Sequence, residues 1–396
     1  MPGPILVLNA GSSSLKAAFF PEGEPERRVS ASVDRIGASH GPRSELTLKR
    51  DGKKESIPAK GKDVMSALEE ILGAFDVALE DLDAVGHRIV HGGPKHTAPA
   101  LLNAAVLSDL EKVAPLDPDH LPAEIALVRD LRKRAPRLVQ SASFDTAFHR
   151  TMPRVAKLLP IPGKYERAGV HRYGFHGLSY TYLVGELARL AGNDAADGRL
   201  VIAHLGSGAS LAAIHRRESL DTTMGFTPTA GIPMGTRTGS IDPGVLLHLL
   251  RTEKMSVDEL DRFVNHDAGL LAVSGTSADM RDLLASRAND ARAADAVDLF
   301  CYEVRKTVGA FAAVLGGVDT IVFSGGIGEK SAPVRAAVGE GLAWLGVNID
   351  ADANEQNADV ISTRASKIQV RVIPTDEESV ILRETLDVLA VRKDAT

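Results

Sequence analysis

Two arginines stand in surroundings where each could hold an anion. Arg88 lies in GHRIVHGG, between His87 and His91, and Arg237 lies in MGTRTGSIDPG, which is too rich in glycine and threonine for a helix or strand interior. Because a guanidinium group makes two-pronged contacts with carboxylate or phosphate, the two arginines together indicate an anionic substrate on a charged reaction path. Taken singly, each would more often be a surface charge.

A hydroxyl-rich turn follows the apolar run ILVL near the amino terminus. In NAGSSSLK, backbone N–H groups and the hydroxyls of Ser12 and Ser14 come together with the positive charge of Lys16. Such a turn can form a nest for phosphate oxygens, and a plain serine-rich β-turn fits the local composition equally well.

Two later turns share this chemistry. HLGSGAS, from His204 to Ser210, has similar small and hydroxyl residues. SGGIGEKS places Gly325, Gly326 and Gly328 between a strand and a helix, where bare backbone can approach a nucleotide. Because the glycine spacing fits neither a Walker A loop nor a Rossmann fingerprint, the turns predict a nucleotide site of another type.

The histidines invite a metal interpretation, which we set aside. His87 and His91 are spaced i, i+4 in a predicted strand, where such residues lie about 13 Å apart, and the H-E-x-x-H zinc signature is absent. His176 in YGFHG is interpreted as a hydrogen-bond donor to a phosphoryl group in transit. For the other histidines a role in the core stays open.

Carboxylates recur at segment ends, at Asp145 in SFDTAFH and in VIPTDEES. On local grounds the run 376–378 is the acidic first turn of a terminal helix with Thr375 as N-cap. The alternative is a magnesium site, which needs only one such carboxylate when phosphate supplies further ligands.

Composition limits the classes of protein that remain. The 396 residues suggest two domains, and the net charge of -6 argues against nucleic acid or an anionic membrane as the main partner. Cys301 is the only cysteine and lies in a predicted helix, so an internal disulfide and a thiolate zinc cage are excluded, and a buried, inert thiol is expected. The sequence shows neither a basic signal region nor a membrane-length apolar run, which indicates a cytoplasmic protein.

The elements that position these residues follow an α/β order. Hydrophobic periodicity predicts, in sequence, strands at 4–10, 15–20, 28–33 and 45–50, a helix at 63–75, a strand at 83–90, a helix at 122–136, a strand at 138–145, two strands within 199–215, a helix at 288–315, and a strand, turn and helix within 320–338. The later paired strands repeat the opening pair around a small-residue turn, which suggests two related halves.

Eight motifs in this order resemble acetate kinase and its close relatives that phosphorylate short fatty acids: LNAGSSSLK, GHRIVHGG, FDTAFH, YGFHG, HLGSGAS, MGTRTGSIDPG, FSGGIGE and IPTDEE. The resemblance spans essentially the whole chain. It implies an actin-like (ribonuclease H-like) α/β fold of two duplicated lobes with the active site in the cleft, and a homodimer. The amino-terminal lobe would comprise 1–149 with 379–396, and the nucleotide-binding lobe 150–378.

The resemblance also implies roles for individual residues. The catalytic residues would be Asp145, Arg88, Arg237 and His176. The acyl pocket would contain Val90, Leu116, Phe175 and Pro228. The nucleotide and its phosphates would be bound by Ser12, Ser14, Lys16, His204, Gly206, Ser207, Gly208, Asp279, Met280, Arg281, Gly325, Gly326, Ile327 and Gly328. Asn9 and Glu377 would form the Mg²⁺ site, with Mn²⁺ as an alternative ion, which favours a functional Glu377 over a simple helix start.

The implied reaction is acetate plus ATP giving acetyl phosphate plus ADP, reversibly. Since acetate is already ionised at neutral pH, we assign Asp145 the orientation of the arginines or of metal-bound water in preference to the role of general base. The alternatives are a propionate or butyrate kinase of the same fold and, less favoured, a non-enzymatic actin-like nucleotide-binding protein.

The chain departs from the usual family pattern at several positions. Asp117 replaces a histidine near the acyl pocket, with His120 three residues later. The other departures are Leu178 for Thr, Tyr180 for His, Ser207 for Asn, Ser240 for Asp, Met280 for Phe and Lys330 for Asn. They leave nucleotide preference and acyl-chain length more open than the type of reaction.

Overall fold

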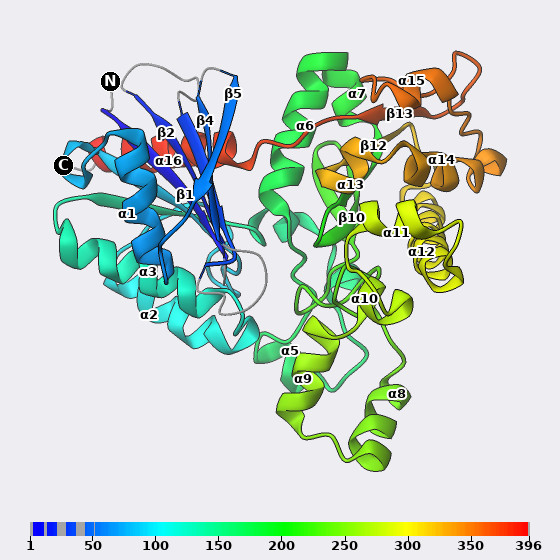
Figure 1. The fold of residues 1–396 in the computed structure, drawn as a ribbon, viewed down its shortest axis with the longest axis horizontal. Helices are drawn as coiled ribbons and strands as arrows, with labels where there is room; N and C mark the ends of the chain where they lie inside the picture. The colour runs from blue at the N-terminus through cyan, green and yellow to red at the C-terminus, as the bar shows by residue number, and fades with distance from the viewer. Residues whose placement is uncertain (1–2, 12–13, 22–28, 37–43, 51, 395–396) are drawn as a thin grey trace. The chain divides into compact units, whose positions relative to one another are not determined.

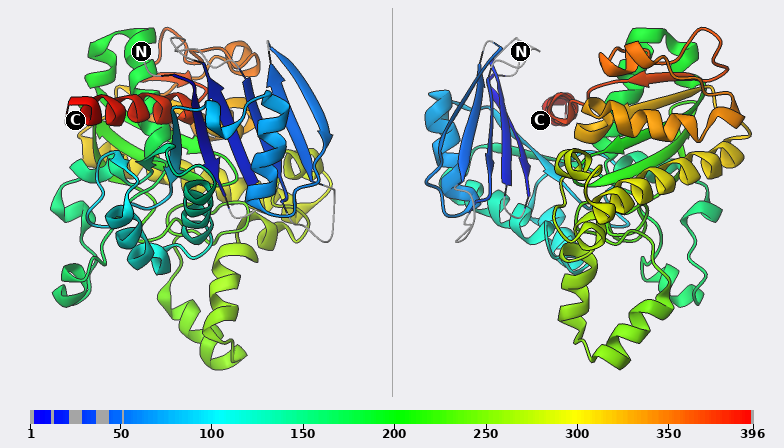
Figure 2. Two further views of the ribbon diagram at one scale, coloured as in Figure 1. Left: turned by 90° about the vertical axis from the view of Figure 1, so that its left-hand side faces the viewer. Right: turned by 45° about the vertical axis from the view of Figure 1, so that its right-hand side comes forward.

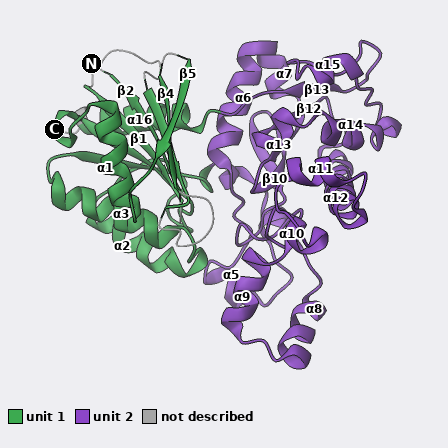
Figure 3. Ribbon diagram, in the orientation of Figure 1, with its two compact units in different colours: residues 1–147, 376–396 green, residues 148–375 purple. Residues whose placement is uncertain are grey.

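The computed structural model describes residues 3–11, 14–21, 29–36, 44–50 and 52–394. The chain divides into two compact units: unit 1, residues 1–147 with 376–396, and unit 2, residues 148–375 (Figure 3). These limits lie two residues before the expected boundary after 149 and three before the one after 378. The second difference assigns Glu377 to unit 1, whereas the predicted limits assigned it to the other lobe.

Unit 1 is built on an eight-stranded sheet in the order β5-β4-β3-β2-β1-β6-β8-β7. Strands β1 to β5 pair antiparallel, whereas β1, β6 and β8 run parallel. Its elements are β1 Ile5–Ala10, β2 Ser14–Phe20, β3 Val29–Asp34, β4 Glu45–Arg50, β5 Lys53–Pro58, α1 Val64–Phe75, η1 Leu79–Asp81, β6 Ala84–Ile89, β7 Ala100–Leu101, α2 Ala104–Val113, η2 Ala114–Leu116, α3 Leu121–Arg134, β8 Val139–Phe144 and α16 Glu377–Asp394.

Unit 2 has a five-stranded sheet in the order β11-β10-β9-β12-β13, again with antiparallel pairing on one side of the central β9 and parallel pairing on the other. Its elements are η3 Ala147–Thr151, α4 Arg154–Lys157, α5 Gly163–Arg167, α6 Gly177–Ala191, α7 Asn193–Asp197, β9 Arg199–Leu205, β10 Ala209–His215, β11 Glu218–Thr222, α8 Pro243–His248, η4 Leu249–Glu253, α9 Val257–His266, α10 Gly269–Ser274, α11 Met280–Ser286, α12 Ala291–Leu315, β12 Thr320–Ser324, α13 Gly325–Lys330, α14 Ala332–Glu340, η5 Ala343–Leu345, α15 Ala351–Glu355 and β13 Gln369–Val372. The element η3 begins at the last residue of unit 1.

The two sheets share one topology, which confirms the predicted duplication. The order β3-β2-β1-β6-β8 in unit 1 matches β11-β10-β9-β12-β13 in unit 2, with the same strand directions. Figure 1 shows both sheets, dark blue to blue-green in the first unit and green to red in the second. The loops that follow β1 and β6 leave the same edge of the first sheet, because these two strands are parallel. The loops that follow β9 and β12 do the same in unit 2. This arrangement brings candidate site residues together within each unit.

Helices cover both faces of each sheet. In unit 1, α1 packs on β2 and β3, and α16 packs on β1, β6 and β8. In unit 2, α6 packs over one face and α12 runs along the other, as Figure 2 shows for the long yellow helix. None of the described helices is both long and apolar enough to span a lipid bilayer.

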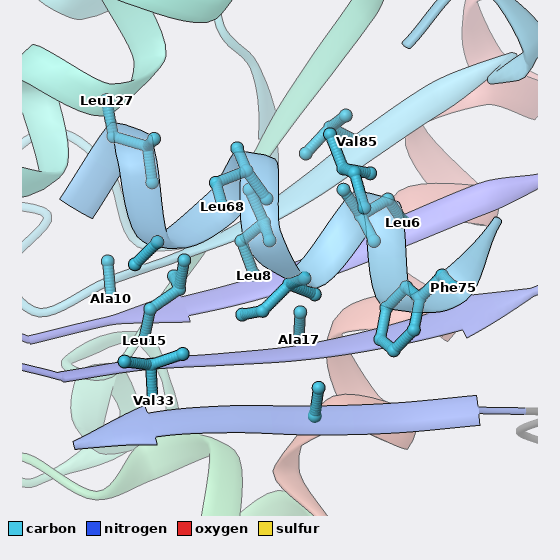
Figure 4. Packing of buried hydrophobic residues seen from close by; sticks show 14 of the residues in the cluster. Leu6, Leu8, Ala10, Leu15, Ala17, Val33, Leu68, Phe75, Val85 and Leu127 are labelled. Atoms are coloured by element: carbon cyan, nitrogen blue, oxygen red, sulfur yellow. The ribbon is translucent and has the colours of Figure 1, made fainter. Parts of the chain in front are cut away.

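Alternation along the strands builds the core of unit 1. Leu6 and Leu8 on β1 face Leu68 and Phe75 of α1 (Figure 4). The helix α1 begins where predicted because Asp63 caps it: its Oδ1 accepts a hydrogen bond from the Ser66 N–H at 2.7 Å.

The start of α16 corrects one prediction. The helix begins at Glu377, and its cap is Asp376, whose Oδ1 accepts a hydrogen bond from the Ser379 N–H at 3.2 Å. Thr375 was predicted as the N-cap, and this was wrong. Thr375 instead accepts a hydrogen bond at its Oγ1 from the Ser179 hydroxyl at 2.9 Å within unit 2.

Candidate active site

Arg88 is fixed at the end of β6 by a buried carboxylate. Its Nη2 and Nε donate hydrogen bonds to Asp145 Oδ2 at 2.6 and 3.1 Å, and the Asp145 N–H donates to Ile89 O at 3.1 Å. Because β6 and β8 are parallel neighbours, their ends lie at one edge of the sheet. The structure therefore brings together two of the predicted catalytic residues.

A second carboxylate beside Arg88 was missed in the sequence. Glu124 on α3 is 1% exposed, its Oε1 lies 3.5 Å from Arg88 Nη1, and its Oε2 accepts a hydrogen bond from the Val90 N–H at 2.9 Å. Glu124 stands in the first turn of a helix, where an acidic residue looks like an ordinary helix start. No sequence signal separates it from such a residue.

The charged groups in this cluster shift one another's pKa values. Burial alone would lower the pKa of Arg88, but the charges of Asp145, Glu124 and Glu377 raise it above its ordinary value, so the guanidinium stays charged. Burial raises the pKa of Glu124 to about 8, against the opposing effects of Arg88 and the Val90 N–H.

The proposed magnesium ligands meet in unit 1. Asn9 Nδ2 donates a hydrogen bond to Glu377 Oε2 at 3.1 Å, and Asn9 lies opposite Lys16 in the β1–β2 pairing. Partial burial and the charge of Asp145 raise the pKa of Glu377 to about 7. Among the described residues, none donates a hydrogen bond to Asp145 Oδ1, which is buried.

The opening turn is only partly described. Gly11 N–H donates to Ser14 O at 2.8 Å, which closes the turn between β1 and β2, and a Cβ at Gly11 would approach Ser14 Oγ to 2.8 Å. Ser14 begins β2 and Lys16 is exposed. Ser12 lies outside the described residues.

Asp117 is buried next to the predicted acyl-pocket residue Leu116. Its Oδ1 accepts hydrogen bonds from His120 Nδ1 at 2.8 Å and from the His120 N–H at 3.2 Å. Val90 is buried and Leu116 partly buried. Through its charge, Asp117 adds to the upward shift of the pKa of Glu124, so this departure from the family pattern acts on the Arg88 cluster.

His176 immediately precedes α6 with φ of 59°, a left-handed conformation that is rare for a residue other than glycine. Its Nδ1 hydrogen-bonds Ser210 Oγ at 2.8 Å. The carbonyl of the preceding Phe175 accepts a hydrogen bond from His149 Nε2 at 3.0 Å. These contacts hold the strained position in place.

His176 and Arg237 border the same small space beside Gly208. A Cβ built on Gly208 would lie 3.4 Å from His176 Nε2 and 3.8 Å from Arg237 Nη1. Arg237 Nη1 also donates to Pro228 O at 3.3 Å. The structure thus brings together the predicted catalytic residues of unit 2, one predicted pocket residue and the predicted phosphate loop.

The remainder of that loop is tied to its neighbours. The Gly206 N–H donates to Gly208 O at 3.0 Å, and the Gly235 N–H donates to Ser207 O at 3.3 Å. The rings of His204 and His176 are 4.4 Å apart, and His204 Nδ1 hydrogen-bonds Ser179 Oγ at 2.8 Å.

The predicted adenosine segment lies at the start of α11. Asp279 Oδ2 accepts from Arg281 Nη2 at 2.5 Å, and this pairing lowers the pKa of Asp279. Met280 is 3% exposed. A Cβ on Gly235 would lie 3.3 Å from Ala278 O. Since Gly235 is also hydrogen-bonded to Ser207 O, the predicted adenosine segment lies close to the loop that contains Ser207.

The glycine-rich turn after β12 requires its first glycine. Gly325 has φ of +73°, and a Cβ there would lie 2.7 Å from Leu205 O at the end of β9. Gly326 is exposed and Gly328 is buried, with Ile327 between them partly exposed. The turn therefore lies beside the His204 loop, and α13 begins at Gly325 itself.

Two further residues that the sequence did not reveal hold this turn. Glu329 Oε1 accepts hydrogen bonds from the N–H groups of Gly325 at 3.0 Å and Thr375 at 3.3 Å. Arg335 is fully buried and donates to Gly328 O at 2.9 Å and to Asn354 Oδ1 at 2.7 Å.

His87 and Cys301 have structural surroundings. His87 is buried on β6 with its Nε2 2.9 Å from Gln140 Oε1, and burial lowers its pKa to about 4. Burial likewise raises the pKa of Cys301 on α12 to about 11. The core position left open for His87 and the burial expected of Cys301 are confirmed, and the inertness of the thiol stays a prediction.

Comparison with known proteins identifies relatives along the whole chain. The model of the Acetokinase family matches residues 4–383. An acetate kinase of Clostridium botulinum (strain Hall) is 43% identical over 395 residues, which cover 97% of this chain and 99% of the relative. A crystal structure of Porphyromonas gingivalis acetate kinase has a TM-score of 0.86 at 36% identity, covering 98% of this chain and 100% of that chain. A propionate kinase structure from Francisella tularensis has a TM-score of 0.88 at 34% identity, and the match covers 96% of this chain and 98% of that chain. The family model over 4–383 and the full-length relative at 43% identity show that the chain belongs to the acetokinase family.

Proposed function

We propose that this protein transfers the γ-phosphoryl group of ATP to acetate, giving acetyl phosphate and ADP, and that it runs the reaction in both directions. The observation that carries the proposal is the approach of His176 Nε2 and the Arg237 guanidinium to the bare backbone of Gly208. A hydrogen-bond donor, a positive charge and a glycine turn in one place suit a phosphoryl group.

Charge neutralisation is the main task in this reaction. Acetate and the γ-phosphate repel each other, and little covalent chemistry is required of the protein. We assign Arg88, Arg237 and His176 the binding of oxygens whose charge grows in the transition state. Asp145 orients Arg88, since the two make two hydrogen bonds.

We assign the acyl chain to Val90, Leu116, Phe175 and Pro228. Val90 and Phe175 are buried apolar side chains, and the backbone N–H of Val90 is held by Glu124. An apolar pocket distinguishes chain lengths only modestly, since one methylene is worth about 1 to 3 kcal/mol. A propionate or butyrate kinase therefore stays the alternative. The similar structure from Francisella tularensis is named a propionate kinase.

The oxygen ligands in unit 1 fit magnesium. Asn9, Glu377 and Asp145 Oδ1 offer the hard oxygen donors that Mg²⁺ or Mn²⁺ prefers. Burial first, and the charge of Asp145 second, raise the pKa of Glu377. Within the described ranges no three His, Cys, Asp or Glu side chains are grouped to hold a metal by themselves. We therefore infer that Asn9 and Glu377 bind the ion together with phosphate oxygens and water. When bound, it supplies further neutralisation of phosphate charge.

ATP and ADP are assigned to two groups of residues. We propose that Ser12, Ser14, Lys16, His204 and Gly206–Gly208 contact the phosphates. The adenosine side falls to Asp279–Arg281 and Gly325–Gly328, where exposed Gly326 leaves room for a base. Use of ATP supports a cytoplasmic location, and the family supports a homodimer without nucleic acid or membrane partners.

The decisive experiment traps acyl phosphate as hydroxamate with ATP and Mg²⁺ and each of acetate, propionate and butyrate, against a control without acid. We expect the largest kcat/KM with acetate. A higher value with propionate or butyrate would reassign the substrate, and no product with any acid would reject the enzymatic proposal.

Metal dependence is tested in the same assay. Removal of divalent ions with EDTA should abolish hydroxamate formation, and added Mg²⁺ or Mn²⁺ should restore it. Asn9→Ala should raise the Mg²⁺ concentration needed for half-maximal rate, whereas Asn103→Ala, which removes a helix cap of α2, should not. Full activity in EDTA would contradict the assignment.

A further inference from the structure

A buried hydroxyl chain leads from α6 to the imidazole of His176. Tyr180 Oη lies 2.5 Å from Ser210 Oγ, and Ser210 Oγ lies 2.8 Å from His176 Nδ1. Tyr180 and Ser210 are both fully buried. The other ring nitrogen, Nε2, is the one that approaches Gly208.

The position of each member is fixed by packing. The Tyr180 ring lies 5.7 Å from that of Phe148 and 5.5 Å from that of His149, centroid to centroid. Ser210 belongs to β10 and pairs with His204 across the sheet. His176 is held at φ of 59° just before α6, so β10 and the start of α6 set the backbone positions of the three residues.

Two arrangements of this chain donate the single Ser210 proton to one of its two neighbours. In the first, Tyr180 donates to Ser210 Oγ and Ser210 donates to His176 Nδ1, which requires an unprotonated Nδ1 and a proton on Nε2. In the second, His176 Nδ1–H donates to Ser210, and Ser210 donates to the phenol oxygen. A phenol is more acidic than an aliphatic hydroxyl and is therefore the better donor, which favours the first arrangement.

We propose that Tyr180 is a positioning residue that acts through Ser210 to hold neutral His176 with its proton on Nε2. The proton then lies on the nitrogen that faces Gly208 and the Arg237 guanidinium, ready for donation to an anionic oxygen. This inference rests on the proposed phosphoryl transfer for its catalytic meaning, but the proton position itself is a property of the unliganded protein.

Histidine side-chain NMR tests the proposal directly. The protein labelled with ¹⁵N-histidine is compared with Tyr180→Phe and Ser210→Ala, and the signal of His176 among the 12 histidines is assigned with His176→Asn. In the unmodified protein Nδ1 should show the shift of an unprotonated nitrogen and Nε2 that of a protonated one. Both variants should move population to the Nδ1–H form.

A matched control removes a different phenol group from unit 2. Tyr173→Phe deletes the hydroxyl that donates to Gly169 O at 2.8 Å, outside the chain from Tyr180 to His176. It should leave the His176 spectrum unchanged. In the Ser210→Ala background, Tyr180→Phe should have no further effect on the spectrum, because the two hydroxyls act in series.

The kinetic expectation is a reduction of kcat by about tenfold in Tyr180→Phe, with KM for ATP and acetate changed less than about twofold. A protonated Nδ1 in the unmodified protein, or an unchanged spectrum in folded Tyr180→Phe, would overturn the proposal even if the enzyme is active. The expected spectra in a protein that forms no acyl phosphate would instead support the proton position and reject the proposed function.

Discussion

At the scale of the residue, the two arginines differ in what surrounds them. Arg88 lies between Asp145, which accepts two hydrogen bonds from it, and Glu124, whose Oε1 is 3.5 Å from its Nη1. Arg237 donates to the neutral Pro228 carbonyl beside Gly208. Because Arg237 borders Gly208 together with His176, we expect it to contact the phosphoryl group directly.

Arg237→Ala should leave ATP affinity within about threefold and lower the rate of phosphoryl transfer by at least about 100-fold, because its charge is needed most in the transition state. ATP binding by calorimetry and hydroxamate formation measure the two effects. Arg262→Ala, which removes an exposed arginine paired with Asp267, is the control and should retain full activity. Equal losses of ATP binding and rate in Arg237→Ala would show that the side chain serves ground-state binding.

The raised pKa of Glu124 predicts how the stability of the protein depends on pH. This pKa is raised from 4.5 to about 8. Between these two pH values the folded protein keeps a proton on Glu124, whereas the unfolded chain releases it. The contribution to stability is fully present below about pH 4.5 and is lost as the pH rises toward 8. Glu124→Gln is neutral throughout and should escape this loss.

Denaturant unfolding at about pH 5 and pH 8 measures the difference. The free energy of unfolding of Glu124→Gln relative to the unmodified protein should rise between the two pH values by more than ~1 kcal/mol. Glu80→Gln, at an exposed position, should show no such change. A difference independent of pH would mean that Glu124 ionises normally in the fold.

At the scale of the element, α16 is the piece of chain that returns to complete unit 1. Gly86 on β6 has no room for a side chain, because a Cβ would collide with Thr385 Oγ1 and lie 2.9 Å from Ile381 Cγ2. The close approach places the amino end of the helix, with Glu377, beside Asn9. Packing of α16 therefore also determines the proposed magnesium site.

Gly86→Ala should lower the free energy of unfolding by about 1 to 3 kcal/mol through overpacking. It should also raise the Mg²⁺ concentration needed for half-maximal rate in the hydroxamate assay, because it shifts Glu377. Gly73→Ala is the matched control. Nothing lies within 4 Å of a Cβ at Gly73 in α1, so this change should stabilise the protein by about 0.5 to 1 kcal/mol. The same sign for both substitutions would contradict the packing argument.

At the scale of the whole molecule, each duplicated unit brings a different part of the proposed chemistry. Unit 1 supplies Arg88, Asp145, Asn9 and Glu377, whereas unit 2 supplies His176, Arg237 and the nucleotide turns. In both units the chemistry follows the ends of the central strands, because the parallel strands of this topology end at one edge.

The proposed homodimer is tested by sedimentation equilibrium. We expect a mass of twice the 42.0 kDa chain at micromolar protein concentration, independent of ATP. A mass of 42.0 kDa under these conditions would reject the homodimer without affecting the proposed reaction.

The amino-acid sequence by itself determined many of the elements and the duplication, but β5, α2 and α6 were not among the predicted elements. Hydrophobic periodicity is local, so the strands around NAGSSSLK and HLGSGAS and the helix over 63–75 could be predicted from short windows. Arg88, His176 and Arg237 were recognisable because glycine-rich turns and motif order surround them.

Only the tertiary structure decided which distant groups act on these residues. Glu124 reaches Arg88 across 36 positions, and Tyr180 reaches Ser210 across 30. A helical glutamate and a buried tyrosine carry no local mark of such a role, because strand pairing and helix packing create the contact. The same holds for Asp376, which caps α16 where Thr375 was expected, since the choice between adjacent polar residues depends on how the helix enters its sheet.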